Sequence, residues 1–178
     1  MRSAALLRGI NVGGRNPVRM DHLRSIVGSI GATDVTTYLQ SGNVIFDAPI
    51  AGPELEAVLS ASLARELGFD VPIVTRTSKE MTPIARSHPF DAAATGDRRL
   101  YVVFLSAPPT GSTGKQVSVP DGCTDRLLVR GREVYLDLAN AGRTKLTLTW
   151  LERQLGVTGT QRNWRTTKAV DALLRDRS

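Results

Sequence analysis

The chain has 178 residues, 41% of them apolar and 22% charged, which is typical of a globular protein and not of a disordered or fibrous one. The single cysteine, Cys123, excludes an internal disulfide, and the two histidines have no partners at ligand spacing, so we expect no metal site. No apolar run of about 18 residues and no leader pattern is present, so we expect a cytoplasmic protein without a membrane partner.

The first 77 residues are expected to form one unit with the order strand, helix, strand, strand, helix, strand. Helical spacing of apolar residues predicts a helix from Met20 to Ile30 and a second one from Pro53 to a stop at Gly68. This is the ferredoxin-like order, an antiparallel sheet with helices on one face. Apolar runs predict the strands at residues 3–8, 35–40, 43–47 and 71–75.

A connector at residues 78–98, with a short helix capped by Ser78, leads to a second unit at residues 99–178. This unit repeats the order less cleanly, because a polar stretch from Ser106 to Asp125 stands where the first unit has a helix. Asn163 is expected to cap a last helix. The fold class is therefore α+β, with two ferredoxin-like (βαββαβ-type) units in one compact body. The second set of strands is predicted at residues 100–105, 126–130, 133–138 and 157–162.

A glycine-rich loop, residues 8–16, joins the first strand to the first helix. Its glycines allow backbone N–H groups to approach a ligand, and the helix that follows offers a partial positive charge. Arg8 and Arg15 can form bidentate contacts with phosphate or carboxylate. The spacing resembles a Walker A loop, but Arg15 and Asn16 replace its Lys and its Ser or Thr, and Pro17 interrupts the entry into the helix, which argues against a P-loop.

The ferredoxin-like order places this loop beside the turn at residues 40–43, because the first two strands run parallel and end at the same edge. Converging donors suit a ligand with anionic oxygens. The alternative is a pair of ordinary turns, in which Gly, Asn and Ser serve only the local backbone. The candidate ligand-binding residues are Arg8, Asn11, Gly13, Gly14, Arg15, Gln40, Ser41 and Asn43.

Positive charge is concentrated in the last 36 residues, which carry +5 of the chain's net charge of +6. Such a segment can attract nucleic acid, or it can be a solvated face. Arg162, Asn163 and Arg165 flank a helix start and form a secondary anion candidate, while Trp164 is expected to anchor the core. Aromatic residues make up only 5% of the chain, which speaks against an RNA-recognition sheet.

Three strings, at residues 8–16, 37–44 and 162–164, together resemble a bacterial family of unknown function, domain of unknown function 1697. The resemblance extends over nearly the whole chain. It implies an α+β fold built on ferredoxin-like subdomains, and it implies no established activity, cofactor or catalytic residue. The chain departs from the family at Arg15, where the family often has Lys, and at Thr144-Lys145, where the pattern tends towards Ser-Lys.

The leading functional hypothesis is the binding of a small anionic ligand, phosphate- or nucleotide-like, at the edge formed by residues 8–16 and 40–43. No motif places a general base, so neither a reaction nor a cofactor is assigned. The alternative is a nucleic-acid-binding module that uses the basic C-terminal segment. A third possibility is an interaction role, such as a homodimer formed through a sheet edge.

Overall fold

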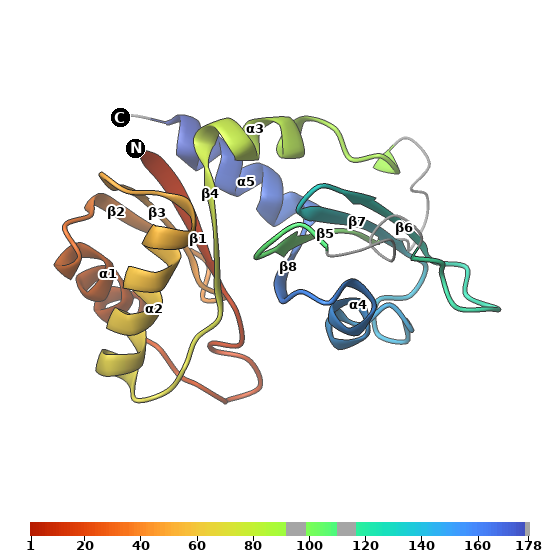
Figure 1. Cartoon of the computed structure of the whole chain (residues 1–178), viewed down its shortest axis with the longest axis horizontal. Coiled ribbons are helices and arrows are strands. Elements are labelled where there is room, and N and C mark those ends of the chain that lie inside the picture. The colour runs from red at the N-terminus through yellow and green to blue at the C-terminus, as the bar shows by residue number, and fades with distance from the viewer. Residues whose placement is uncertain (92–98, 110–116, 177–178) are drawn as a thin grey trace. The chain divides into compact units, whose positions relative to one another are not determined.

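The computed structural model describes residues 1–91, 99–109 and 117–176, which form two compact units (Figure 1). Unit 1 comprises Met1–Pro83 together with Ala169–Ser178, and unit 2 comprises Ile84–Lys168. The sequence suggested a connector at residues 78–98 and a second unit at residues 99–178. That division stays a prediction; by their internal contacts, the two compact units meet in sequence between Pro83 and Ile84, and the end of the C-terminal helix belongs to unit 1.

Unit 1 has a four-stranded antiparallel sheet in the order β2-β3-β1-β4. Ala5 in the central strand β1 lies opposite Val44 of β3 and Thr75 of β4. Because β1 and β2 are both antiparallel to β3, they run parallel and end at the same edge, which is the expected ferredoxin-like arrangement. The elements are β1 (Arg2–Leu7), α1 (Met20–Ser29), β2 (Thr33–Tyr38), β3 (Asn43–Asp47), α2 (Gly52–Leu67) and β4 (Ile73–Thr77).

Helices α1 and α2 cover one face of this sheet (Figure 1). Burying a large apolar side chain contributes about 1.5–3 kcal/mol, and a one-residue slip of a strand would turn its buried set outward. The core therefore fixes the register that brings the ends of β1 and β2 together. Its main members are Leu7, Val44 and Phe46 from the sheet, Leu23, Ile26 and Val27 from α1, and Leu55, Leu59 and Leu63 from α2.

Helix α3 (Ser78–Arg86) follows β4 directly and is capped by Thr77, not by Ser78 as the sequence suggested. The amide of Glu80 donates to Thr77 Oγ1 at 3.3 Å, and the amide of Thr77 donates to Glu80 Oε2 at 2.8 Å. This reciprocal pair is a capping box, whose signature is a Ser or Thr followed three residues later by Glu. The helix start is thus displaced by one residue from the prediction.

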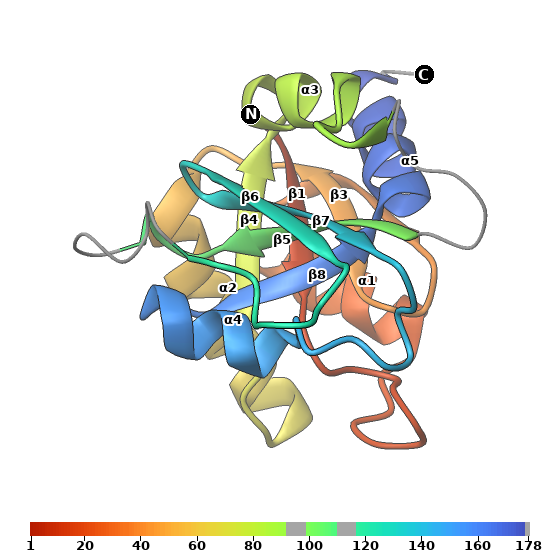
Figure 2. The same cartoon turned by 90° about the vertical axis from the view of Figure 1, so that its right-hand side faces the viewer.

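Unit 2 repeats the sheet, with strand order β6-β7-β5-β8 and α4 beside the strands (Figure 2). Buried Val103, Leu136 and Leu151 belong to its core. Between β5 and β6, the described residues 106–109 and 117–125 form no helix. The elements are β5 (Arg99–Leu105), β6 (Arg126–Arg130), β7 (Glu133–Leu138), α4 (Leu148–Leu155), β8 (Gly159–Asn163) and α5 (Trp164–Arg175).

The C-terminal part of α5 belongs to unit 1 and contacts α3 there. Thr82 Oγ1 donates a hydrogen bond to Asp171 Oδ1 at 2.9 Å. Leu173 and Ile45 of β3 line the same small cavity of ≈ 230 Å³. Within the described part of the chain, no helix is both long and apolar enough to cross a bilayer.

Candidate functional site

The glycine-rich loop and the turn between β2 and β3 meet at one edge of the unit 1 sheet, which confirms the topological expectation. The Leu7 amide donates to the carbonyl oxygen of Gly42 at 2.8 Å. The side-chain amide of Asn11 donates to the carbonyl oxygen of Gln40 at 2.9 Å, across 29 residues of sequence. We call this region, residues 8–16 and 40–43, the loop–hairpin edge.

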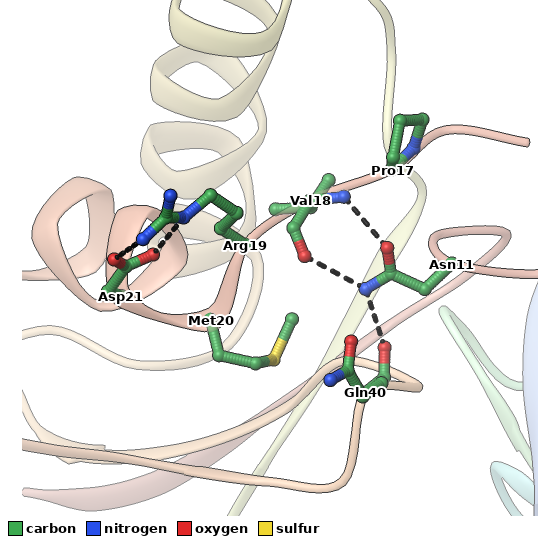
Figure 3. A pocket seen from close by; sticks show the side chains of 7 residues that line it. All are labelled: Asn11, Pro17, Val18, Arg19, Met20, Asp21 and Gln40. Atoms are coloured by element: carbon green, nitrogen blue, oxygen red, sulfur yellow. Dashed lines mark hydrogen bonds and ion pairs between the residues drawn. The ribbon is translucent and has the colours of Figure 1, made fainter.

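Asn11 fastens this edge through its side chain. Besides the bond to Gln40, its Nδ2 donates to the carbonyl oxygen of Val18 at 2.9 Å, and its Oδ1 accepts from the Val18 amide at 2.8 Å (Figure 3). Its backbone is in the left-handed region at φ 54°, which Asn tolerates better than most residues. Asn11 is thus a structural clamp between the loop, the start of α1 and the hairpin.

The loop also closes on itself. The Asn11 amide donates to the carbonyl oxygen of Asn16 at 3.0 Å, and the Arg15 amide donates to that of Val12 at 3.0 Å. Gly13 and Gly14 have φ values of 57° and 75°, a conformation in which other residues are strained. The glycines therefore shape a tight turn, and the amides of Asn11 and Arg15 already have partners inside it.

On the hairpin side, Asn43 is fully buried. Its Nδ2 donates to the Tyr38 carbonyl oxygen at 2.8 Å and to Ser41 Oγ at 3.2 Å, so its amide group closes the turn. Gly42 has φ 78°, and a Cβ there would lie 2.8 Å from Leu7 Cβ and 2.8 Å from Ile10 Cδ1. Glycine is the residue that lets the hairpin approach the loop this closely.

An open depression of ≈ 420 Å³ lies beside the loop–hairpin edge (Figure 3). Two of the residues proposed from the sequence, Asn11 and Gln40, line it. The rest of the lining comes from the segment that leads into α1 and from the first turn of that helix, none of which was among the candidate ligand-binding residues. These residues are Pro17, Val18, Arg19, Met20 and Asp21.

Arg19 and Asp21 form a two-point ion pair in this lining. Arg19 Nε lies 3.1 Å from Asp21 Oδ1, and Nη2 lies 2.6 Å from Oδ2. Asp21 Oδ1 also accepts from the His22 amide at 2.8 Å. The hydrogen bond from Arg19, followed by that from His22, lowers the pKa of Asp21 to about 2. The sequence signal for this pair is the Arg-x-Asp spacing at the start of α1, from the N-cap Arg19 to the first turn.

The other candidates at this edge differ in exposure. Arg15, Gln40 and Ser41 are exposed, as are Gly13 and Gly14, whereas Arg8 at the end of β1 is half-buried. Among the described residues, the guanidinium of Arg15 has no ion-pair partner. The edge thus presents an exposed guanidinium, an amide and a hydroxyl, while Asn11 and Asn43 hold it together.

The secondary anion candidate in unit 2 consists of Arg162, Asn163 and Arg165. The first two form hydrogen bonds within the protein. Arg162 is only 7% exposed, and its Nη1 donates to Thr160 Oγ1 at 2.9 Å and to the Gln161 carbonyl oxygen at 2.8 Å. Burial lowers the pKa of Arg162 to about 10. Asn163 Oδ1 accepts from the Thr166 amide at 2.7 Å and caps α5 as expected. Arg165 alone of the three residues is an exposed cation.

His88 is a buried residue of unit 2 whose role the sequence did not reveal. Its Nε2 lies 3.1 Å from the Tyr101 carbonyl oxygen, and its Nδ1 accepts from the Phe90 amide at 3.3 Å. Its ring lies against Trp164, with 5.1 Å between the ring centroids. Burial lowers the pKa of His88, in keeping with a neutral ring. In the described residues, no three His, Cys, Asp or Glu side chains form a group able to hold a metal ion.

The two strand orders and the two sheets define a mixed α+β protein built from a repeated ferredoxin-like unit. The sequence profile of the family described as "Protein of unknown function (DUF1697)" matches residues 1–135, so the chain belongs to that family. A solved structure, the conserved bacterial protein SP0830 from Streptococcus pneumoniae, is similar over 98% of each chain with a TM-score of 0.73 and 21% identity. That likeness shows the fold. No curated protein matches the chain.

Proposed function

We propose that this protein binds a small anionic ligand, with phosphate- or nucleotide-like chemistry, at the loop–hairpin edge of unit 1. The observation that carries the proposal is the Asn11 clamp, whose hydrogen bonds to Gln40 and Val18 tie the loop to the hairpin beside the ≈ 420 Å³ depression. A site whose supporting groups are already fixed loses less entropy when it binds a ligand.

Whereas Arg8 is half-buried, Arg15 is the exposed cation of the loop–hairpin edge. Its guanidinium is exposed and has no ion-pair partner among the described residues, whereas the charge of Arg19 is opposed by Asp21. A guanidinium offers several N–H donors in a planar fork that matches phosphate oxygens. Arg15 is therefore the residue that would attract and hold the anion, while the exposed Gln40 and Ser41 would orient it.

The direct test is a calorimetric titration of the full chain with inorganic phosphate, adenosine monophosphate and acetate at millimolar concentration. We expect Arg15→Gln to weaken phosphate binding about tenfold, since a charge-assisted contact contributes about 1.5–3 kcal/mol when it is well formed and less when exposed. Arg65→Gln is the matched control, because Arg65 is an exposed arginine of α2 that pairs with its neighbour Glu66.

Two results would contradict the proposal. One is the absence of both a heat of binding and a rise in melting temperature with all three anions. A ligand that binds only the folded state must raise the stability of that state. The other is an equal loss of binding in the two variants. Titration with an oligonucleotide at two salt concentrations is the companion measurement, because binding through the basic C-terminal segment would weaken steeply with salt and survive Arg15→Gln.

A further inference from the structure

A second cavity of unit 1 lies apart from the loop–hairpin edge. It measures ≈ 230 Å³ and is on the sheet face opposite α1 and α2, because Ile45 lines it while its neighbours Val44 and Phe46 belong to the core beneath those helices. We infer that this cavity binds a small zwitterion, a molecule of the class of the free α-amino acids that carries both a carboxylate and an ammonium group. The cavity is lined by Arg2, Asp34, Thr36, Ile45, Leu173 and Asp176.

Arg2 brings a hydrogen-bond donor to this cavity that the protein leaves unsatisfied. Its side chain is only 8% exposed, and its Nη1 donates to Asp34 Oδ2 and, at 3.3 Å, to Asp47 Oδ2. Its Nε is buried and has no hydrogen-bond partner among the described residues. Such an atom is rare in a folded protein and requires an explanation. The Nε side of a guanidinium is an edge at which a carboxylate binds through both oxygens, so Arg2 can receive a ligand and keep its ion pairs.

The same lining offers carboxylates to a positive group. Asp34 lies where the register of β2 against β3 shifts, and a bulge of this kind turns a side chain in a new direction. The Asp176 amide donates to the Ala172 carbonyl oxygen at 3.0 Å, which ties Asp176 to the last turn of α5. One guanidinium and two carboxylates give the lining a net negative charge. A simple anion is therefore disfavoured, whereas a ligand that carries its own ammonium group fits both signs of charge.

The volume and the apolar part of the lining set the size of the ligand. One water needs about 10–15 Å³ of such space, so a cavity of ≈ 230 Å³ exceeds what a single water bonded to Arg2 Nε requires. It is also below the roughly 300–1,000 Å³ of sites for drug-sized ligands. Ile45 and the half-buried Leu173 add aliphatic surface. An amino acid with a short aliphatic side chain matches these features, and leucine is the probe that we choose.

The test is a nuclear magnetic resonance titration of the full chain with leucine and with two analogues of the same shape. Isovalerate lacks the ammonium group, and isoamylamine lacks the carboxylate. Leucine should give saturable shifts at the amides of Thr36, Ile45 and residues 172–176. It should bind about fivefold more tightly than either analogue, because each analogue loses one partly exposed charge interaction.

Asp34→Asn separates a role in binding from a role in folding. Asn tolerates the φ of 50° at this position and still accepts a hydrogen bond from Arg2. The affinity for leucine should fall about fivefold, while that for isovalerate should not fall, since a repelling carboxylate has been removed. Arg2→Lys keeps the charge but not the planar fork, so it should weaken leucine and isovalerate about tenfold and spare isoamylamine. Asp70→Asn, which removes an exposed carboxylate outside the cavity, is the control for net charge.

Leu173→Phe tests the site without changing its charges, and it keeps the inference testable if Arg2→Lys does not fold. The larger side chain fills part of the cavity, so leucine binding must weaken, whereas Arg15→Gln at the other site must bind leucine as wild type does.

Four results would overturn the inference. Equal affinity for isovalerate would show a simple carboxylate site, and equal affinity for isoamylamine a simple cation site. An equal loss of leucine and isovalerate in Asp34→Asn, or the same loss of leucine in Asp70→Asn, would make Asp34 a structural residue. Finally, the absence of shifts with leucine up to high millimolar concentration would mean that the cavity and Arg2 Nε hold water only.

Discussion

Units 1 and 2 have the same strand order, and they also share individual backbone hydrogen bonds at the end of the first strand. In unit 1 the Leu7 amide donates to the Gly42 carbonyl oxygen at 2.8 Å, and in unit 2 the Leu105 amide donates to that of Arg132 at 2.8 Å. The residue that follows each leucine bonds to the segment before the fourth strand at 2.9 Å, Arg8 to Pro72 and Ser106 to Thr158. The hairpin therefore docks on the end of the first strand in the same way twice.

What differs is the segment that leaves the first strand. In unit 1 it is a short glycine-rich loop, locked by Asn11 and leading into α1. In unit 2 the described part of residues 106–125 contains no helix, and the corner is closed by a contact between Ser106 Oγ and Thr158 Oγ1 at 3.1 Å. The sheet topology thus places a hairpin against the end of the first strand in both units. Only unit 1 adds the glycine-rich loop there, and this loop is what makes its edge a candidate site.

The largest effect is expected at the hairpin of unit 1. Gly42→Ala should lower the free energy of unfolding by about 3 kcal/mol, because it combines a strained left-handed residue with overpacking against Leu7 and Ile10. Urea unfolding followed by circular dichroism measures it. Gly28→Ala is the control: its Cβ meets open space within α1, so the helix should gain stability instead. An unchanged free energy of unfolding in Gly42→Ala would show that the close approach of the hairpin to Leu7 and Ile10 does not contribute to stability.

A smaller effect is expected for the clamp that distinguishes the two units. Asn11→Gly keeps a residue that tolerates φ 54° but removes three side-chain hydrogen bonds, which should cost about 2 kcal/mol. The Val18 amide, which donates to Asn11 Oδ1, should then exchange its proton faster. Unchanged exchange at Val18 would mean that the loop is held by its glycine turn alone.

The smallest effect concerns His88 of unit 2. Burial lowers its pKa in the folded state, so below the usual pKa of about 6.5 the unfolded state binds more protons than the folded state. Stability should therefore be full above this pH and fall as the pH is lowered from 7 towards 5. His88→Gln should flatten this part of the unfolding curve, and His22→Gln, with His88 in place, should keep the slope. If the free energy of unfolding still falls between pH 7 and pH 5 in His88→Gln, the pH dependence comes from other groups.

Much of the fold could be predicted from sequence because its signals are local. Residues 126–130 and 133–138 were predicted as strands and form β6 and β7 at those bounds, and Gly68 marked the end of α2. Asn163 was recognised as a helix cap, whereas Thr77 was missed in favour of Ser78. The capping box depends on which of two adjacent hydroxyls meets Glu80, and that is decided by where β4 ends.

The candidate site was predicted in its location but not in its parts. Topology alone brought the loop and the hairpin together. The roles of Asn11 and Asn43 depend on carbonyl groups of Gln40, Val18 and Tyr38 that only the folded backbone presents. The burial of Arg162 likewise follows from its position in β8, beside Val102 of the central strand, and not from its own chemistry.

The central claim is tested most directly by a nuclear magnetic resonance titration of the whole protein with inorganic phosphate, followed at the backbone amides of both units. The account predicts saturable shifts confined to residues 8–16, 19–22 and 40–43 of unit 1, with Ser106, Gly131 and Arg132 at the equivalent corner of unit 2 unmoved. Shifts at the unit 2 corner alone, or none up to concentrations well above physiological phosphate, would contradict it.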